Sequence, residues 1–337
     1  AEASEVINTR WWTQFEDQVL DQLIDEALTA NLDVRTAAAR VEQFAARLNI
    51  TRSDFYPQVG YGAAGDRQGI SSNNADGLGI DAITTNYQAT INVGWELDVW
   101  GRIRRASESA RAELLAAEEA RRTVILSLVS TVATSYVGLR SLDRQLEIAI
   151  ETRDSRGESL RLFTLQYGGG VIGQLQLSQI KSEYELAVSA IPTIERDIAM
   201  MENLINVLLG RNPGPVPRGK NIDELTLAQV PNGVPSDLLL RRPDIRQAEQ
   251  DLIANNALIG VARAAYFPRI SLTGVAGLVS GDLSRWFDSD AATWAVGGAL
   301  SGEIFTGGRI SGGVQQAEAL QQQSLFTYQQ TILVALQ

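Results

Sequence analysis

The chain has 337 residues, of which 45% are hydrophobic, so it can bury a sizeable core and is not a disordered protein. Its 29 basic and 40 acidic residues give a formal net charge of -11, which argues against a nucleic-acid partner because phosphate binding needs a basic face. Cysteine and histidine are both absent, which removes thiol nucleophiles, the commonest general base and the commonest metal ligands. We therefore expect no enzyme, no cofactor and no metal site.

Two features bear on targeting. No run of eighteen apolar residues occurs, so the sequence predicts no membrane-spanning helix. The first five residues, Ala1 to Glu5, have neither the charged nor the apolar region of a signal peptide and are typical of a mature or trimmed start.

The first 55 residues are predicted to be helical. A short amphipathic helix up to residue 30 begins with an aromatic cluster of Trp11, Trp12 and Phe15, which we interpret as a packing anchor because aromatic rings supply large buried area. A second helix is expected over residues 31–55 and ends before Pro57.

A β-hairpin is predicted next, with strands over residues 57–67 and 87–100 and a loop over 69–85. In the second strand the odd positions are apolar and most even positions are polar, so one face of the strand is hydrophobic and the other is polar. Strands of about ten residues are long enough to cross a bilayer. From the pattern alone, a sheet covered by helices in a soluble α+β protein is an equal alternative.

A very long helix is expected from Arg102 to Leu165, because apolar residues recur every three or four positions and no proline interrupts. Three consecutive glycines in the segment 167–173 predict a turn, and they lack the Lys-Ser/Thr of a phosphate-binding loop. A second helix over 174–209, kinked at Pro192, and an irregular segment to about residue 235 should follow.

The pattern then repeats. Residues 31–37 match 242–248, and 52–57 match 263–268, at one offset of 211; Glu96, Gly101 and Arg102 match Glu303, Gly308 and Arg309 at an offset of 207. The chain is thus predicted to be a tandem duplication of helix, hairpin and helix, with the second hairpin over 268–305 and its loop over 280–292. The second copy is expected to be truncated, because the chain ends before the counterpart of Leu209. Four strands cannot close a barrel alone, since their edges would be unpaired.

These segments together resemble the TolC-like outer-membrane channels of bacterial efflux pumps, especially the OprM-like and CusC-like lipoprotein branch. The most specific combination is residues 238–245 followed by 262–268. The other matching segments are Trp11-Trp12 with Phe15, residues 31–35, Pro57, Trp95 to Arg102, and Phe305 to Arg309.

The resemblance implies an α+β membrane protein acting as a homotrimer. Each chain would give four β-strands to a trimeric 12-stranded outer-membrane β-barrel, and its long antiparallel helices would form a periplasmic α-helical barrel. The β-barrel would be built by the hairpins 57–100 and 268–305. An equatorial region would comprise residues 1–30 and 211–235. The α-helical barrel would comprise residues 31–56, 101–210, 236–267 and 306–337.

The resemblance also implies partners: a periplasmic adaptor (membrane fusion) protein, an inner-membrane RND-type pump that supplies the energy, and outer-membrane lipid. It places the adaptor-contacting tip at Tyr167, Gly168, Gly169, Gly170, Val171, Ile172 and Gly173, with three glycines where the family has one. The gate is expected in the missing second tip. The family's acylated amino-terminal cysteine is absent from this sequence.

With the barrel assumed, the strand pattern assigns the two faces. The lipid-facing residues are predicted to be Tyr87, Ile91, Val93 and Trp95, and the lumen-facing residues Gln88, Thr90, Asn92 and Glu96. Trp95 and Trp100 are favoured as interfacial belt residues over core aromatics, with Tyr87 and Trp294 open to both interpretations. Asp98, Glu96 and Glu303 either give the duct a cation-tolerant wall or cap and pair with Arg102 and Arg309 at the junctions of sheet and helix.

The function expected from the resemblance is a passive exit duct of a tripartite efflux pump, conducting drugs or other small toxic compounds from the periplasm to the outside. Type I protein secretion and metal efflux are alternatives within this class. A soluble periplasmic coiled-coil scaffold or adaptor is the alternative from a different class.

Overall fold

The computed structural model describes residues 10–69, 71, 83–226 and 241–336. The chain divides into two compact units, one of residues 1–39 and 120–236 and the other of residues 40–119 and 237–337. Parts of the predicted loop over 69–85, of the irregular segment up to residue 235 and of the matching segment 238–245 lie outside the described residues.

In the first unit, a short amino-terminal region packs on the middle of a long helix. The 3-10 helix η1 (Trp11–Phe15) precedes α2 (Gln18–Ala30), and the long helix is α5 (Arg102–Gly168). Their apolar faces, with the end of α6 (Gln174–Leu208), form one core. Trp12 is buried in this core and both Trp11 and Phe15 pack against it, so the packing role predicted for the aromatic cluster is confirmed.

A buried polar network closes this core. The phenol of Tyr136 donates to Asp17 Oδ2 at 2.8 Å and accepts from the backbone N–H of Gly219 at 2.9 Å. Asp17 also caps α2 by accepting from the N–H of Val19. Burial and the hydrogen bond to Asp17 raise the pKa of Tyr136 to about 12. One carboxylate thus joins a helix start, a helix middle and a distant loop.

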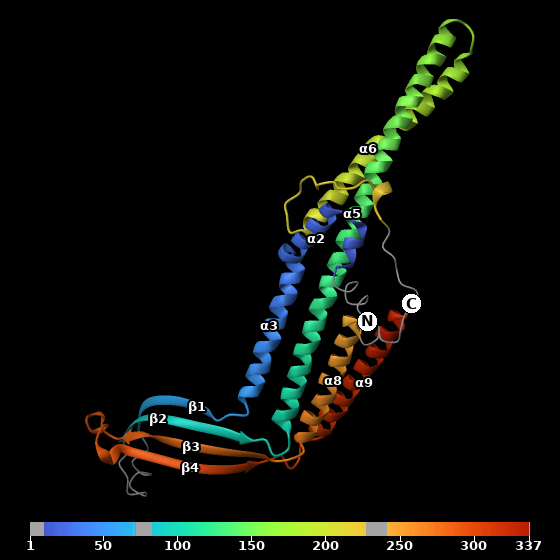
Figure 1. The fold of residues 1–337 in the computed structure, drawn as a ribbon. Coiled ribbons are helices and arrows are strands. Elements are labelled where there is room, and N and C mark those ends of the chain that lie inside the picture. The colour runs from blue at the N-terminus through green and yellow to red at the C-terminus, as the bar shows by residue number, and fades with distance from the viewer. Residues whose placement is uncertain (1–9, 70, 72–82, 227–240, 337) are drawn as a thin grey trace. The chain divides into compact units, whose positions relative to one another are not determined.

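Helices α5 and α6 run side by side to the turn that joins them (Figure 1). The structure extends α5 three residues beyond the predicted end at Leu165, and α6 continues through Pro192. In α5, one 18-residue window has a mean hydropathy of 1.3, and 39% of it is buried. By length and composition this helix could cross a membrane although it has no unbroken apolar run, but the core helix of a soluble protein can have the same length and composition.

The second unit holds a four-stranded antiparallel sheet with strand order β1-β2-β3-β4 (Figure 1). The strands are β1 (Gln58–Gly69), β2 (Ile83–Leu97), β3 (Arg269–Ser280) and β4 (Ala292–Ser301). Helix α3 (Leu32–Ser53) leads into β1, α8 (Pro243–Ala264) leads into β3, and α9 (Arg309–Ala335) follows β4. The order helix, hairpin, helix therefore occurs twice, and the predicted tandem repeat and α+β fold class are confirmed.

The strand limits differ from the sequence expectation. β2 begins four residues earlier than Tyr87 and ends at Leu97 instead of Trp100, and β4 ends at Ser301. The alternation of apolar and polar residues continues past Leu97, but the side chain of Asp98 is hydrogen-bonded to the start of α5, and Gly101 adopts φ +78°. These local interactions end the strand despite the pattern. The loop between β3 and β4 contains two 3-10 turns, Leu283–Arg285 and Ser289–Ala291.

Candidate functional site

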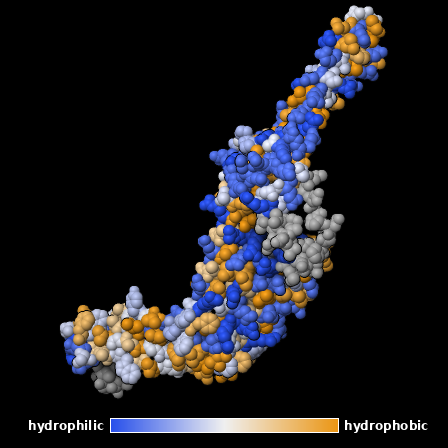
Figure 2. Space-filling model, in the orientation of Figure 1, coloured by the Kyte–Doolittle hydropathy of each residue, from blue (hydrophilic) through white to orange (hydrophobic). Residues whose placement is uncertain are grey.

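One face of the sheet is apolar on all four strands. Directly opposed residues in an antiparallel pair share a face, so the register defines whole rows across the sheet. One row is Tyr61, Ile91, Ala276 and Trp294, and the next is Val59, Val93, Gly274 and Val296. Figure 2 shows hydrophobic residues, in orange, among paler and light-blue ones over the region of the strands. The predicted lipid-facing residues Ile91, Val93 and Trp95 all lie on this face.

The opposite face carries small and polar side chains. One row across it is Gly62, Thr90, Gly277 and Thr293, and another is Gly60, Asn92, Val275 and Ala295. The predicted lumen-facing residues Gln88, Thr90, Asn92 and Glu96 belong to this face, since all four occupy even positions along β2. The sheet therefore has one face suited to hydrocarbon and one suited to water.

The apolar face is open to the surroundings in the single chain. Tyr61 is 93% exposed, Trp294 76% and Val296 77%, although each has an apolar side chain on a regular strand. Among the described residues, β1 and β4 each pair with a strand on one side only. An exposed apolar face with two unpaired edges needs an apolar environment and further strands.

The junction between β2 and α5 is held by two carboxylates. Asp98 accepts hydrogen bonds from the N–H groups of Ile103 and Arg104, both at 2.9 Å, and so caps the helix. Glu96 accepts from Nε and a terminal nitrogen of Arg102 at 2.9 and 3.0 Å, a bidentate pair.

The second repeat has the same ion pair, between Arg309 and Glu303, where Gly308 takes φ +90°. Of the two roles open for Glu96, Asp98 and Glu303, capping and pairing at the junctions is the one that the structure shows. Lining of the duct by Glu96 stays a prediction.

Two tryptophans anchor the sheet at the same end. The indole of Trp95 donates to the carbonyl of Phe55 at 3.0 Å, and that of Trp100 donates to the carbonyl of Pro268 at 2.7 Å. The Trp100 ring stacks on Phe267, with centroids 4.6 Å apart. Both indoles keep partly exposed surfaces, which is the amphipathic arrangement typical of an interfacial belt.

The glycine turn between α5 and α6 closes by a Schellman motif. The N–H of Val171 bonds the carbonyl of Gln166 at 2.9 Å, and the N–H of Gly170 bonds the carbonyl of Tyr167 at 3.0 Å. Only Gly170 of the three consecutive glycines has positive φ, at +74°, while Gly168 is the last residue of α5. Val171, 74% exposed, and Tyr167, 42% exposed, present apolar surface at this turn.

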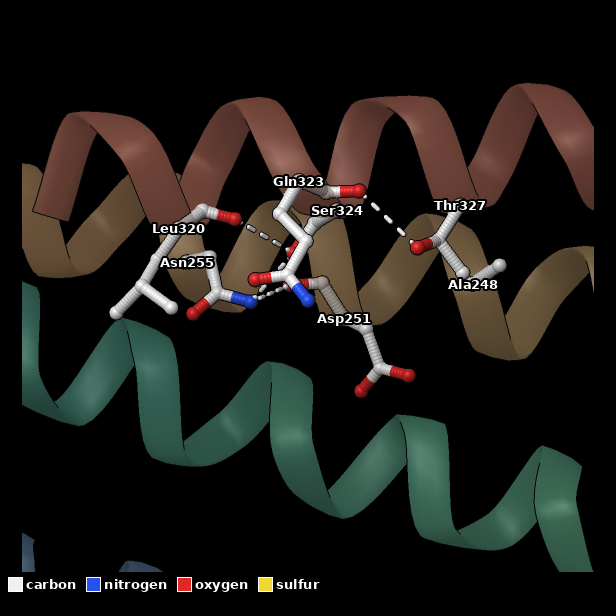
Figure 3. A pocket seen from close by; sticks show the side chains of 7 residues that line it. All are labelled: Ala248, Asp251, Asn255, Leu320, Gln323, Ser324 and Thr327. Atoms are coloured by element: carbon white, nitrogen blue, oxygen red, sulfur yellow. Dashed lines mark hydrogen bonds between the residues drawn. The ribbon is translucent and has the colours of Figure 1, made fainter.

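A polar cavity of about 330 Å³ between α8 and α9 had no counterpart among the sequence predictions (Figure 3). The amide of Asn255 donates to Ser324 Oγ at 2.7 Å and thereby links the two helices. Desolvation raises the pKa of the nearby Asp251, and the charge of Arg40 partly opposes that shift. No sequence motif marks this cavity, because its residues come from two segments about seventy positions apart.

Solved structures that share this architecture include outer-membrane channels. The chain superposes on a crystal structure of CusC with a TM-score of 0.87 and 36% sequence identity, covering 96% of this chain and 75% of that one. The Campylobacter jejuni CmeC outer membrane channel gives a TM-score of 0.91 at 27% identity, covering 97% of this chain and 70% of that one. The fold and the two-faced sheet thus define a channel protein of the bacterial outer membrane that extends into the periplasm.

A family model described as outer membrane efflux protein matches residues 23–211 and 234–337. The solvent efflux pump outer membrane protein SrpC of Pseudomonas putida is 37% identical over 95% of this chain and 68% of its own length. The cation efflux system protein CusC of Escherichia coli O6:H1 is 38% identical over 96% of this chain and 70% of its own length. The chain belongs to the outer membrane efflux protein family, and the predicted family and localisation are confirmed.

Proposed function

We propose that three copies of this chain form the exit duct of a tripartite efflux pump. In this assembly the four-stranded sheets of three chains close a 12-stranded barrel in the outer membrane. Efflux through it is passive, and an inner-membrane RND-type pump supplies the energy.

The sheet is the observation that supports this proposal. Its apolar face is exposed on β1 and β4, and the outer edges of these two strands are free of described partners. Pairing β1 of one copy with β4 of the next would satisfy both edges without any other protein. A soluble scaffold offers no cover for Tyr61, Trp294 and Val296, and we therefore favour the duct.

The barrel gives each face of the sheet a role. Tyr87, Ile91, Val93 and Trp95 would face lipid, with Trp95 and Trp100 in the interfacial belt. Gln88, Thr90 and Asn92 would face the lumen, and so would Glu96, which is paired with Arg102. A polar, small-residue lumen wall suits cargo that passes without being bound.

The turn Tyr167–Gly173 is the segment that we assign to contact with a periplasmic adaptor protein. It joins two helices in a closed hydrogen-bonded turn and exposes Val171 and Tyr167. A rigid turn with exposed apolar side chains can dock a partner at little cost in conformational entropy.

We infer drugs, solvents or similar small toxic compounds as the cargo. Cation efflux is the second candidate, because the Escherichia coli cation efflux relative is as similar to this chain as the Pseudomonas putida solvent efflux relative. Sequence identity to these relatives does not distinguish between the two kinds of cargo. We assign the selection of cargo to the inner-membrane pump. Export of proteins remains the third alternative.

Disulfide cross-linking tests the barrel. The chain has no cysteine, so introduced cysteines report contacts without background. Tyr61→Cys on β1 is combined in turn with Trp294→Cys, Val296→Cys and Leu300→Cys on β4. At least one pair should give an oxidation-dependent covalent trimer in outer membranes, because neighbouring strands bring Cα atoms to about 5–6 Å.

The matched control replaces Tyr61→Cys by Ile91→Cys, which lies on the same face but on the inner strand β2. This variant should give no cross-linked trimer with any of the three β4 positions, because β1 separates it from the next copy. Absence of a trimer from every β1–β4 pair, or a ladder of larger species, would contradict the closed trimeric barrel.

A further inference from the structure

The two repeats are built alike where the strands meet the helices, but one aromatic contact occurs in the first repeat alone. Strands β1 and β3 have the same limits at the offset of 211. At that offset Tyr56 is the counterpart of Phe267, and at the offset of 207 Gly307 is the counterpart of Trp100. The indole of Trp100 stacks on Phe267 inside the chain. Tyr56 therefore occupies the position of a stacked ring, while a glycine occupies the position of the indole.

Two aromatic rings are exposed at this end of the sheet. Tyr56 is 69% exposed and Phe305 89%, and neither stacks on another aromatic ring among the described residues. Phe305 holds the position that Asp98 has in the first repeat. Asp98 accepts hydrogen bonds from the start of α5, which a phenyl ring cannot do, and α9 begins without a side-chain cap. The junction of its own chain therefore makes no such use of Phe305.

The repeat indicates where a partner for these rings would come from. Within the chain β2 pairs with β3, and extending their register places Trp100 opposite Phe267. The proposed function, on which this inference rests, pairs β4 of one copy with β1 of the next in the same way. Applying the two offsets places Gly307 opposite Tyr56 of the next copy. Phe305 is then the diagonal neighbour of that Tyr56 on the same face, a separation that aromatic side chains can span.

We propose that Phe305 of one copy packs on Tyr56 of the next copy and fixes the register of β4 against β1 across the subunit boundary. The pair provides between copies the ring contact that Trp100 and Phe267 make within one copy. Space for it exists beside Gly307, because a Cβ added there would have no described atom within 4 Å. The contact buries two exposed rings and specifies a register that strand pairing alone leaves open to slippage.

Cross-linking tests the contact. The chain has no cysteine, so Tyr56→Cys and Phe305→Cys are introduced together and treated in outer membranes with bismaleimidoethane, a short thiol cross-linker. A covalent trimer is expected, because each copy would be joined to both neighbours. The matched control replaces Phe305→Cys by Phe287→Cys. Phe287 is similarly exposed, but it lies in the loop between β3 and β4 at the other end of the sheet, so this control should give no trimer.

The heat stability of the trimer in detergent gives a second readout that needs no cysteine. Phe305→Ala and Tyr56→Ala should each lower the dissociation temperature by about 2 °C or more, because a ring contact is lost. The double variant should lose no more than the less stable single variant, since both changes remove the same contact. Phe305→Tyr keeps the ring and should dissociate as the unchanged protein does, and so should Phe287→Ala.

Three results would overturn the contact. Additive losses in the double variant would show that the two rings do not interact. Equal losses from Phe305→Ala and Phe287→Ala would show that lipid alone covers both rings. A missing Tyr56–Phe305 cross-link, in a protein whose Tyr61 pairs with β4 do form the covalent trimer, would overturn the contact and leave the proposed function standing. If none of these pairs gives a trimer, the proposed function itself is contradicted.

Discussion

The indole of Trp100 donates a 2.7 Å hydrogen bond to the carbonyl of Pro268, which lies 168 positions further along the chain. The bond joins the end of the first hairpin to the start of the second, so it fixes the two repeats to one another at the base of the sheet. The stacked Phe267 ring reinforces the same contact. This junction sets the alignment of β2 with β3, on which the continuous apolar face depends.

Trp100→Phe should therefore destabilise the folded protein by about 1 kcal/mol, because the ring stack is kept while the hydrogen bond is lost. Thermal unfolding in detergent, followed by circular dichroism, measures the change. Trp294→Phe serves as the control, since Trp294 is 76% exposed and should tolerate the change with little effect. Equal shifts in both variants would show that the Trp100 bond adds nothing specific.

The two faces of β2 should respond oppositely to charge. Ile91→Arg places a cation on the apolar face, and near the middle of a bilayer this costs about 2–4 kcal/mol. Membrane assembly of this variant should fall sharply. Thr90→Arg, one residue away on the opposite face, should assemble normally and change ion selectivity. The check is outer-membrane fractionation followed by conductance of the assembled variant, and similar assembly of both variants would contradict the face assignment.

Substitution of two glycines of the turn by alanine should change its stability in opposite directions. Gly170→Ala forces a side chain into positive φ and should destabilise the turn by about 1–2 kcal/mol. Gly168→Ala, at the end of α5, should stabilise the helix by about 0.5–1 kcal/mol. Hydrogen exchange of the amides in the turn reports both effects. If both variants slow the exchange of these amides, or both speed it, the hydrogen-bonding pattern given for the turn is wrong.

Alkaline pH should weaken the first unit through Tyr136. Its pKa is raised from 10.0 to about 12 in the folded protein, so the protonated phenol is favoured there. The resulting stabilisation is fully present below pH 10 and is lost as pH rises towards 12, amounting to roughly 2 kcal/mol. Tyr136→Phe should be less stable at neutral pH and should lack this alkaline loss. Unfolding curves at pH 8 to 12 for both proteins supply the comparison, and parallel curves would contradict the assignment.

Period two in residues 87–97 was enough to predict which β2 side chains share a face, because alternation is a property of the strand itself. The same rule failed at Asp98 and Trp100, whose side chains continue the alternation but bind the start of α5 and the carbonyl of Pro268. Local periodicity does not distinguish a strand residue from a capping residue that follows it.

Contacts between distant segments were beyond the sequence. The pairing of Ile91 with Ala276 follows from the fold of both repeats, and no local pattern fixes that register. The three consecutive glycines correctly predicted a turn between two helices, yet they did not show that only Gly170 among them has positive φ.

The central claim is that three copies of this chain form a conducting duct, and single-channel recording tests it most directly. The full-length protein is purified in detergent, its oligomeric mass is determined, and it is reconstituted in a planar bilayer. We predict a trimer with discrete conductance steps. A monomer that stays in solution without detergent and conducts nothing would contradict the duct and favour a soluble scaffold.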